Sequence, residues 1–374
     1  MSSHLSDTHI YLDLQIVNNN QNNNEPPPVL RFEETRNSPF LPGDSADYFC
    51  SILRFSVETG DEIPVFIPRI ELGESQMDVN KTVYRVTVEH NGVSKTVPLI
   101  WDPIDLSVEP PQPPMLKQNI MSRYYYMTNF SQFLPMMNNA LKEAWSIVGS
   151  GTNNSPFLDF DPETSKFNIN ADVEYITKGT KLYFNSRLYE LLSSFPAKFI
   201  EYKGDKNYRI EFYNHHELHT KPIFKPSTSG KCQVIDFHVI QMFQEIITIG
   251  LWSPVASIVF TSSLLPIKST NTSPPRVFTD TTVGNALSSS GQPNLANIIT
   301  DFEVAISEKN QYRPDISFRI ESEYRLCDMF SMPNLNRIDI SVFWLSCWGD
   351  YVPLHLVPGA MAQIKVLFRN RSFN

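Results

Sequence analysis

The chain has 374 residues, of which 41% are hydrophobic, so it is long enough to bury the core of one large domain or of two ordinary ones. Only 19% of the residues are charged, whereas 28 are Pro, 25 are Phe and 15 are Tyr; this composition favours strands and long loops over exposed helices. The 40 acidic residues outnumber the 31 basic ones, and the net charge of -9 repels phosphate, so we expect no direct nucleic-acid binding.

Residues 1–28 are predicted to be an N-terminal arm followed by an Asn- and Pro-rich linker. Between residues 10 and 17 apolar and polar residues alternate, as in an extended strand with one apolar face. The apolar side chains on that face are Ile10, Leu12, Leu14 and Ile16. Residues 18–24 are almost all Asn and Gln and precede three prolines, a composition that does not order itself. The strand is therefore expected to be attached by this linker and to pair with a strand outside its own domain. The alternative is that it is the first strand of its own domain.

Short apolar runs follow one another from residue 29, which is typical of a β-sandwich or barrel. Strands are predicted over residues 48–57, 63–70, 82–89 and 94–100. The last two flank Asn91 and Gly92, a step that tolerates positive φ and predicts a hairpin turn. A proline cluster within residues 110–114 then indicates a domain boundary.

The middle of the chain predicts two helices. Large apolar residues recur every three or four positions from Phe130 to Trp145 and line one helix face, with Pro135 in its first turn. A shorter amphipathic helix is predicted after Asn185, whose side chain can cap it. Strand patterns return in the C-terminal third. Apolar and polar residues alternate over residues 316–320 and 364–368, and residues 338–348 are almost continuously apolar.

Four cysteines are far apart in the sequence and form no CxxC pair: Cys50, Cys232, Cys327 and Cys347. Neither a disulfide framework nor a zinc knuckle is predicted, and we expect buried, reduced thiols. Residues 1–17 lack a basic start followed by an apolar core, and the most apolar stretch, residues 246–260, is too short to cross a bilayer. The sequence thus predicts no secretion signal and no membrane span, and assembly in the cytoplasm or the nucleus.

Possible metal ligands are densest at His215, His216, Glu217 and His219. Their order is not the His-Glu-x-x-His of a zinc hydrolase, and the flanking residues are typical of a loop. We expect a solvated loop or an interface contact, with a metal site formed by His215, His216 and His219 as the alternative. No framed nucleophile and no glycine-rich phosphate loop occur, so we predict no catalytic residues, no cofactor and no enzymatic activity.

Two segments resemble a known family. Residues 252–267 read WSPVASIVFTSSLLPI. Residues 297–371 contain, in order, an Asp-Phe strand, a Tyr-Arg-Pro turn, an Ile-Asp-Ile strand, a turn with Gly, a Pro-Leu step and a basic closing strand. In this order the motifs resemble penton-type minor capsid proteins of the Polinton, adintovirus, virophage and adenovirus lineage.

The resemblance implies a predominantly all-β chain, a single jelly-roll β-sandwich with an inserted, partly helical, β-containing domain. The jelly roll is expected over residues 29–110 plus 246–374 and the insertion over residues 111–245, with two consecutive β domains as the alternative. The implied function is a homopentamer that closes the five-fold vertices of an icosahedral virion and contacts the major capsid protein.

The same resemblance implies that the N-terminal arm makes assembly contacts with a neighbour or with an internal minor capsid component. The residues expected to make them are Ile10, Leu12, Leu14 and Ile16.

Two other classes of function remain as alternatives. A receptor- or carbohydrate-binding β module could place exposed aromatic rings, such as those of Tyr124 to Tyr126, over sugar faces. A metal-dependent hydrolase on a jelly-roll scaffold would need the His215 cluster to converge with an acid.

Overall fold

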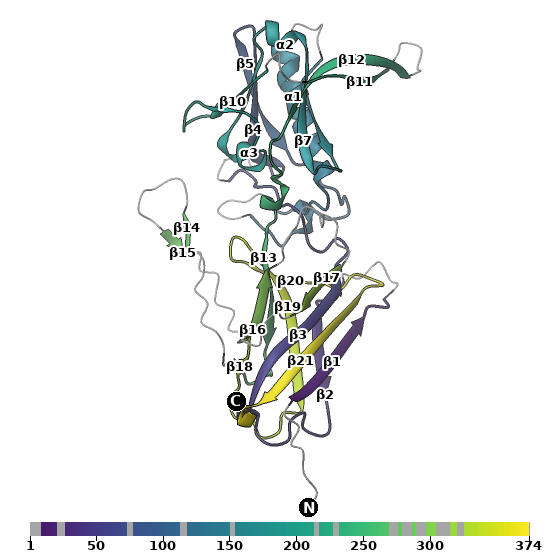
Figure 1. Cartoon of the computed structure of the whole chain (residues 1–374), viewed down its shortest axis with the longest axis vertical. Coiled ribbons are helices and arrows are strands. Elements are labelled where there is room, and N and C mark those ends of the chain that lie inside the picture. Colours follow the sequence, from purple (N-terminus) through teal and green to yellow (C-terminus); the bar gives the residue numbers. More distant parts are fainter. Residues whose placement is uncertain are drawn as a thin grey trace, which may run out of the picture. The chain divides into compact units, whose positions relative to one another are not determined.

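The computed structural model describes residues 9–20, 27–72, 78–112, 118–149, 154–212, 217–226, 232–268, 276–278, 286–288, 297–303, 315–319 and 325–373. These residues are mostly β and divide into two compact units (Figure 1). The described residues up to Pro64 and from Pro254 onward form the first unit, and those from Val65 to Ser253 form the second. The second unit is therefore an insertion between two parts of the first.

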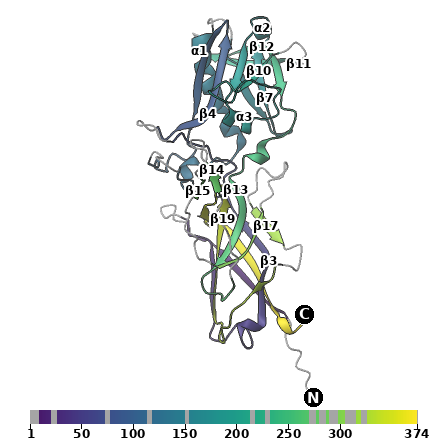
Figure 2. The same ribbon diagram turned by 90° about the vertical axis from the view of Figure 1, so that its left-hand side faces the viewer.

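The first unit is a jelly-roll β-sandwich of two antiparallel sheets (Figures 1 and 2). One sheet has the order β1 (His9–Val17), β21 (Met361–Asn370), β3 (Tyr48–Glu58) and β17 (Asp315–Arg319), and β18 (Cys327–Asp328) also pairs with β3. The other has the order β16 (Asn297–Glu303), β13 (Val255–Ser262), β19 (Arg337–Ser346) and β2 (Arg31–Thr35), and β20 (Tyr351–Pro353) also pairs with β19. A separate ribbon consists of β14 (Arg276–Phe278) and β15 (Ala286–Ser288).

The core of the first unit lies between its two sheets. Phe55 of β3 meets the edge of Phe260 of β13 at 4.9 Å between ring centroids. Phe32 of β2 and Phe302 of β16 lie 6.5 and 6.3 Å from Phe55. All four rings are buried, so inward-facing side chains of the two sheets interdigitate as in other sandwiches.

The described residues of the second unit form two antiparallel sheets and three α-helices. Its first sheet has the order β5 (Val93–Ile100), β4 (Lys81–His90), β8 (Lys181–Phe184), β10 (Tyr208–Glu211) and β9 (Lys198–Phe199). Its second has the order β11 (Glu217–Pro226), β12 (Cys232–Phe243), β7 (Lys166–Asp172) and β6 (Phe157–Asp161). The helices are α1 (Phe133–Val148), which packs on β4, β5 and β6, α2 (Glu174–Thr177) and α3 (Ser186–Leu191). Single 3-10 turns in the two units are Ser45–Asp47, Arg123–Tyr125, Phe130–Gln132, Ile249–Leu251 and Arg371–Phe373.

Trp252 is the centre of an aromatic core in the second unit. Its ring stacks on Phe167 at 5.2 Å with 9° between the ring planes. Phe133 and Phe66 approach it at 5.0 and 5.1 Å. The indole Nε1 donates a hydrogen bond to the carbonyl of Leu191 at 2.8 Å, so this buried donor is also satisfied.

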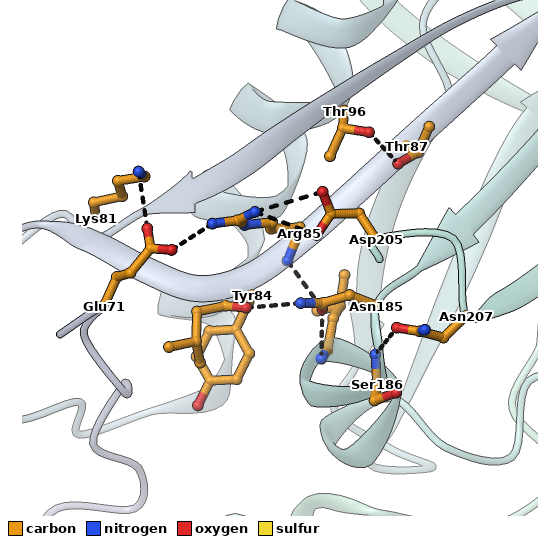
Figure 3. Close-up of polar contacts among 12 residues, drawn as sticks. Glu71, Lys81, Tyr84, Arg85, Thr87, Thr96, Asn185, Ser186, Asp205 and Asn207 are labelled. Carbon is orange, nitrogen blue, oxygen red and sulfur yellow. Dashed lines mark hydrogen bonds and ion pairs between the residues drawn. The ribbon is translucent and has the colours of Figure 1, made fainter. Parts of the chain in front are cut away.

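A polar cluster ties loops of the second unit to β4 (Figure 3). Arg85 of β4 pairs with Glu71 on one side and with Asp205 on the other, where Nη1 and Oδ1 are 3.3 Å apart. Asn185 accepts hydrogen bonds from the backbone amides of Arg85 at 3.1 Å and Leu188 at 3.0 Å, so it both anchors and caps α3. One arginine and one asparagine thus fix two loops and a helix on the same strand.

Both expected helices and the expected hairpin turn are confirmed. Helix α1 begins at Phe133 with Pro135 in its first turn, and Asn185 is the N-cap of α3. Asn91 and Gly92 have φ values of 50° and 79° at the β4–β5 turn, the positive values that the Asn-Gly step predicts.

The segment over residues 63–70, which was expected to be a strand, is not one. It makes only isolated β-bridges, at Phe66 and at Ile70. Pro64 and Pro68 lie within it and have no amide hydrogen to donate to a neighbouring strand, which prevents a continuous ladder.

The two units also differ from the expected jelly roll, residues 29–110 plus 246–374, and the expected insertion, residues 111–245. Residues 65–110 and 246–253 lie in the second unit, because β4 pairs with β8 and β5 and not with a strand of the sandwich. Alternation of apolar and polar residues reveals that a strand has one buried face, but it does not reveal which sheet that face belongs to.

His90 is a buried titratable group in the second unit. Its Nδ1 lies 2.8 Å from the hydroxyl of Thr180, and its ring meets the edge of Trp145 at 5.0 Å and lies near Tyr175. Nε2 is buried and has no hydrogen-bond partner among the described residues. Burial, together with the positive charge of Lys178, lowers the pKa of His90, so the folded protein favours the neutral ring.

Acid is therefore expected to destabilise the second unit through His90. Because the pKa of His90 is lowered in the folded protein, the unfolded chain takes up the proton first as the pH falls. The contribution of His90 to the free energy of unfolding is therefore fully present above the ordinary histidine pKa of about 6.5 and decreases below it. Calorimetric melting at pH 7 and pH 5 should show a larger loss for the wild type than for His90→Asn. His9 is exposed, and His9→Asn is the control, which should lose as much melting temperature as the wild type. An equal loss of melting temperature in the wild type and in His90→Asn would refute the role of His90.

Candidate functional site

The N-terminal strand pairs with the C-terminal strand of its own chain. β1 runs antiparallel to β21, with Ile10 opposite Phe368 and Leu14 opposite Ile364. Leu12 is buried and Ile10, Leu14 and Ile16 are half-buried on the same face as their buried partners. The structure thus corrects the tethered arm to an edge strand, the alternative that the sequence left open, because the apolar face of β1 continues the core face of β21. These side chains point into their own sandwich, and contact with another subunit stays a prediction for them.

The other face and the outer edge of β1 remain accessible in the single chain. Tyr11 and Val17 are 56% and 47% exposed. Asp13 lies between Lys365 at 3.2 Å and Arg54 at 3.7 Å, so two cations on this face share one carboxylate. No strand in the described part of the chain pairs with the outer edge of β1. A row of peptide groups along an unpaired edge can bind a further strand.

The histidine cluster lies partly outside the described residues, since His215 and His216 are not among them. His219 lies in β11 opposite Val239, so the chain forms a strand from Glu217 where a loop was expected. Among the residues that the structure describes, no group of three or more His, Cys, Asp and Glu side chains is close enough to hold a metal ion. No described helix is long and apolar enough to span a membrane.

The tyrosines considered for sugar binding are buried in the second unit. The hydroxyl of Tyr124 donates to Asn80 at 2.8 Å, and that of Tyr125 donates to the carbonyl of Val79 at 3.1 Å. Tyr126 is buried as well, so none of these rings offers a face to a sugar. They stabilise the loop before β4.

The two sequence segments that carry the family resemblance meet at Asp339. This residue is the third of β19, near the start of the strand, and is buried. Its carboxylate accepts hydrogen bonds from the hydroxyls of Ser262 at 2.7 Å and Ser263 at 2.6 Å, and from the amides of Ser263 at 3.0 Å and Leu264 at 2.7 Å. Arg31 of β2 completes the set at 3.0 Å. One carboxylate therefore holds the turn after β13 and the neighbouring strand β2.

The hydrogen bonds decide the charge state of Asp339. Burial by itself raises the pKa of this carboxyl, but the bonds from Ser263, Ser262 and Leu264 outweigh burial and lower it. The group is thus ionised and structural. In the sequence, Asp339 is recognisable only as part of an Ile-Asp-Ile motif. Its buried role could have been inferred because it is a single acid within an almost continuously apolar strand.

Comparison with known families gives a match over nearly the whole chain. The model of the family described as Sputnik minor capsid protein V18/19 matches residues 10–370. "Structural protein V19" of Sputnik virophage is 24% identical over 226 residues, which cover 58% of this chain and 94% of that protein. "Uncharacterized protein V18" of the same virophage is 32% identical over 124 residues, 32% of this chain and 72% of that protein.

Solved structures share the fold. A chain in the 3.5 Å cryo-EM structure of the Sputnik virophage is 25% identical, with a TM-score of 0.77 and 98% of each chain covered. The crystal structure of the mavirus penton protein is 17% identical, with a TM-score of 0.64, and the alignment covers 96% of this chain and 99% of that one. At this coverage, the alignments include both units.

Asp339→Asn is expected to destabilise the first unit by about 2–4 kcal/mol, because the amide leaves buried donors without an acceptor and removes the charge that faces Arg31. Since the folded-state pKa is lowered, the stabilisation is present above the ordinary aspartate value and is lost as the pH falls through the lowered one.

Urea unfolding of the wild type and of Asp339→Asn at pH 7 and pH 3 measures both the loss in free energy of unfolding and its dependence on pH. The exposed Asp301 on β16 supplies the control, and Asp301→Asn should change the free energy of unfolding by less than about 0.5 kcal/mol. Equal effects of the two substitutions would contradict the role given to Asp339.

Proposed function

Because the chain belongs to the Sputnik minor capsid protein V18/19 family and is a penton-like structural protein of the virion, we propose that five copies of it close a five-fold vertex of an icosahedral capsid. The observation that carries the proposal is the alignment of the whole chain, insertion included, with a chain of the Sputnik virion and with the mavirus penton protein. A role in the capsid needs shape and contact surface rather than a reaction, and we propose no catalysis.

Closure of a five-fold ring needs one surface that contacts a different surface on the next copy, so that each rotation adds an identical contact. A jelly-roll sandwich is suited to this because its two sheets form rigid sides, fixed here by Phe55 and its neighbours within the core. The chain supplies such a body in its first unit, and the inserted second unit has an aromatic core of its own around Trp252.

We further propose that the outer edge of β1 contacts the major capsid protein or an internal minor capsid component. The edge is nine residues long, His9–Val17, and its peptide groups can extend the sheet by one strand. Tyr11 and Val17 on the exposed face would add apolar contacts that become buried on assembly. Assembly of these parts would take place in the host cytoplasm or nucleus.

Pentamer formation is testable on the recombinant chain. Mass photometry and negative-stain electron microscopy should show a five-fold particle of about 215 kDa, five times the 42.9 kDa chain, either alone or after co-expression with the major capsid protein. Monomers throughout the micromolar range, at low and high salt and in the presence of the major capsid protein, would refute the vertex assignment.

The contact at the β1 edge has a matched pair of variants. Val17 of β1 is 47% exposed and Val93 of β5, in the second unit, is 53% exposed. Val17→Asp should weaken binding to the major capsid protein by at least about tenfold, because it places an unpaired charge in a desolvated contact, whereas Val93→Asp should leave it unchanged. Both variants should melt like the wild type, since neither side chain is in a core. Equal binding of the two variants to the major capsid protein, measured by co-sedimentation, would exclude the β1 edge as the contact with that protein.

A further inference from the structure

The fold brings together two cysteines that lie far apart in the sequence. β18 pairs antiparallel with β3, and this register places Cys327 directly opposite Cys50. Cys50 is buried and Cys327 is half-buried, and neither is part of a disulfide in the structure. Nothing in the sequence signals the pair, because residues 50 and 327 flank the whole inserted unit.

Residues directly opposite on antiparallel strands have Cα atoms about 4.5–5.5 Å apart and side chains on the same face, within the range of about 4.4–6.8 Å that a disulfide spans. The face is the interior of the sandwich, since Cys327 Sγ donates to the carbonyl of Ile299, on β16 of the facing sheet, at 2.7 Å. The two thiols also affect one another: burial first, and then the neighbouring Cys327, raise the pKa of Cys50.

The neighbouring residue holds the short strand β18 in this register. Asp328 pairs with Arg371 at 2.7 Å, and the guanidinium of Arg371 lies 4.4 Å from the centre of the Phe49 ring. Phe49 is itself the residue opposite Asp328 on β3. This closed set of contacts keeps Cys327 against Cys50 rather than leaving it on a loose segment.

We propose that Cys50 and Cys327 are an oxidative modification site, at which a small-molecule disulfide such as oxidised glutathione converts the two thiols to an intramolecular disulfide. The half-buried Cys327 loses its proton to water and attacks one sulfur of the small disulfide, whose S–S bond breaks and whose thiolate leaves with the electron pair. Cys50 then loses its proton and attacks the Cys327 sulfur, and the second small thiolate leaves. Two protein thiols are oxidised and one small disulfide is reduced to two thiols.

The modification would join the two ends of a loop that contains the complete inserted unit. Because a crosslink over so long a loop restricts the unfolded chain strongly, the oxidised protein should be the more stable form. A capsid protein passes from a reducing cell interior to an oxidising exterior, so the bond would form after assembly has ended. The formation of this disulfide does not depend on pentamer formation, so the two proposals can be tested independently.

The test compares the full chain kept in dithiothreitol with the full chain incubated with oxidised glutathione at pH 8. Before alkylation, the intact mass of the oxidised chain should be about 2 Da below that of the reduced chain. After alkylation in denaturant, nonreducing peptide mapping should find the Cys50 and Cys327 peptides linked. The melting temperature of the oxidised chain should rise by at least about 5 °C. Since burial raises the pKa of both thiols, the reaction should also accelerate between pH 7 and pH 9.

Two variants control this experiment. Cys347 is exposed and Cys347→Ser should retain both the link and the rise in melting temperature, whereas Cys327→Ser should lose both. Cys327 is only half-buried, so this variant avoids the core defect that a change at Cys50 could cause. The proposal is overturned if Cys50 and Cys327 of the oxidised wild-type chain are both alkylated, or if either is linked to Cys232 or Cys347.

Discussion

Asp339 is a charge buried in an otherwise apolar strand, and it is stable there only while the turn after β13 supplies its hydrogen bonds. The carboxylate in return fixes the turn. A shift in register between β13 and β19 would therefore leave the carboxylate and the donors of the turn without hydrogen-bond partners. Arg31 extends the same constraint to β2. Three of the strands that form one side of the sandwich, β13, β19 and β2, therefore depend on one side chain.

The inserted unit is stabilised by contacts of its own. The chain leaves the sandwich at Pro64 and re-enters it at Pro254, and the residues between form a unit with its own sheets and its own aromatic core around Trp252. Each unit buries apolar side chains of its own, as separate domains do. The polar cluster around Arg85 serves the insertion alone.

Features that depend on a few neighbouring residues could be predicted from the sequence, and those that depend on a distant partner could not. The cap at Asn185, the Asn91-Gly92 turn and the apolar face of α1 follow from local chemistry, and the structure contains all three. Membership of β4 and β5 in the second unit does not follow, because a half-buried strand fits any sheet with a free edge. The same reasoning explains the misplaced domain boundary.

Composition and strand periodicity determined a β-rich chain, because both are properties of the residues themselves. The capsid type came from the resemblance of two segments, residues 252–267 and 297–371, to a known family. The sequence also determined that Ile10, Leu12, Leu14 and Ile16 share one face. Only the tertiary structure decided that β1 pairs with β21 of the same chain, so that this face joins the core face of the sheet, and that Cys327 lies opposite Cys50. Both outcomes depend on strand pairing across most of the chain, where the partner is selected by the summed burial of the whole sandwich and not by any local pattern.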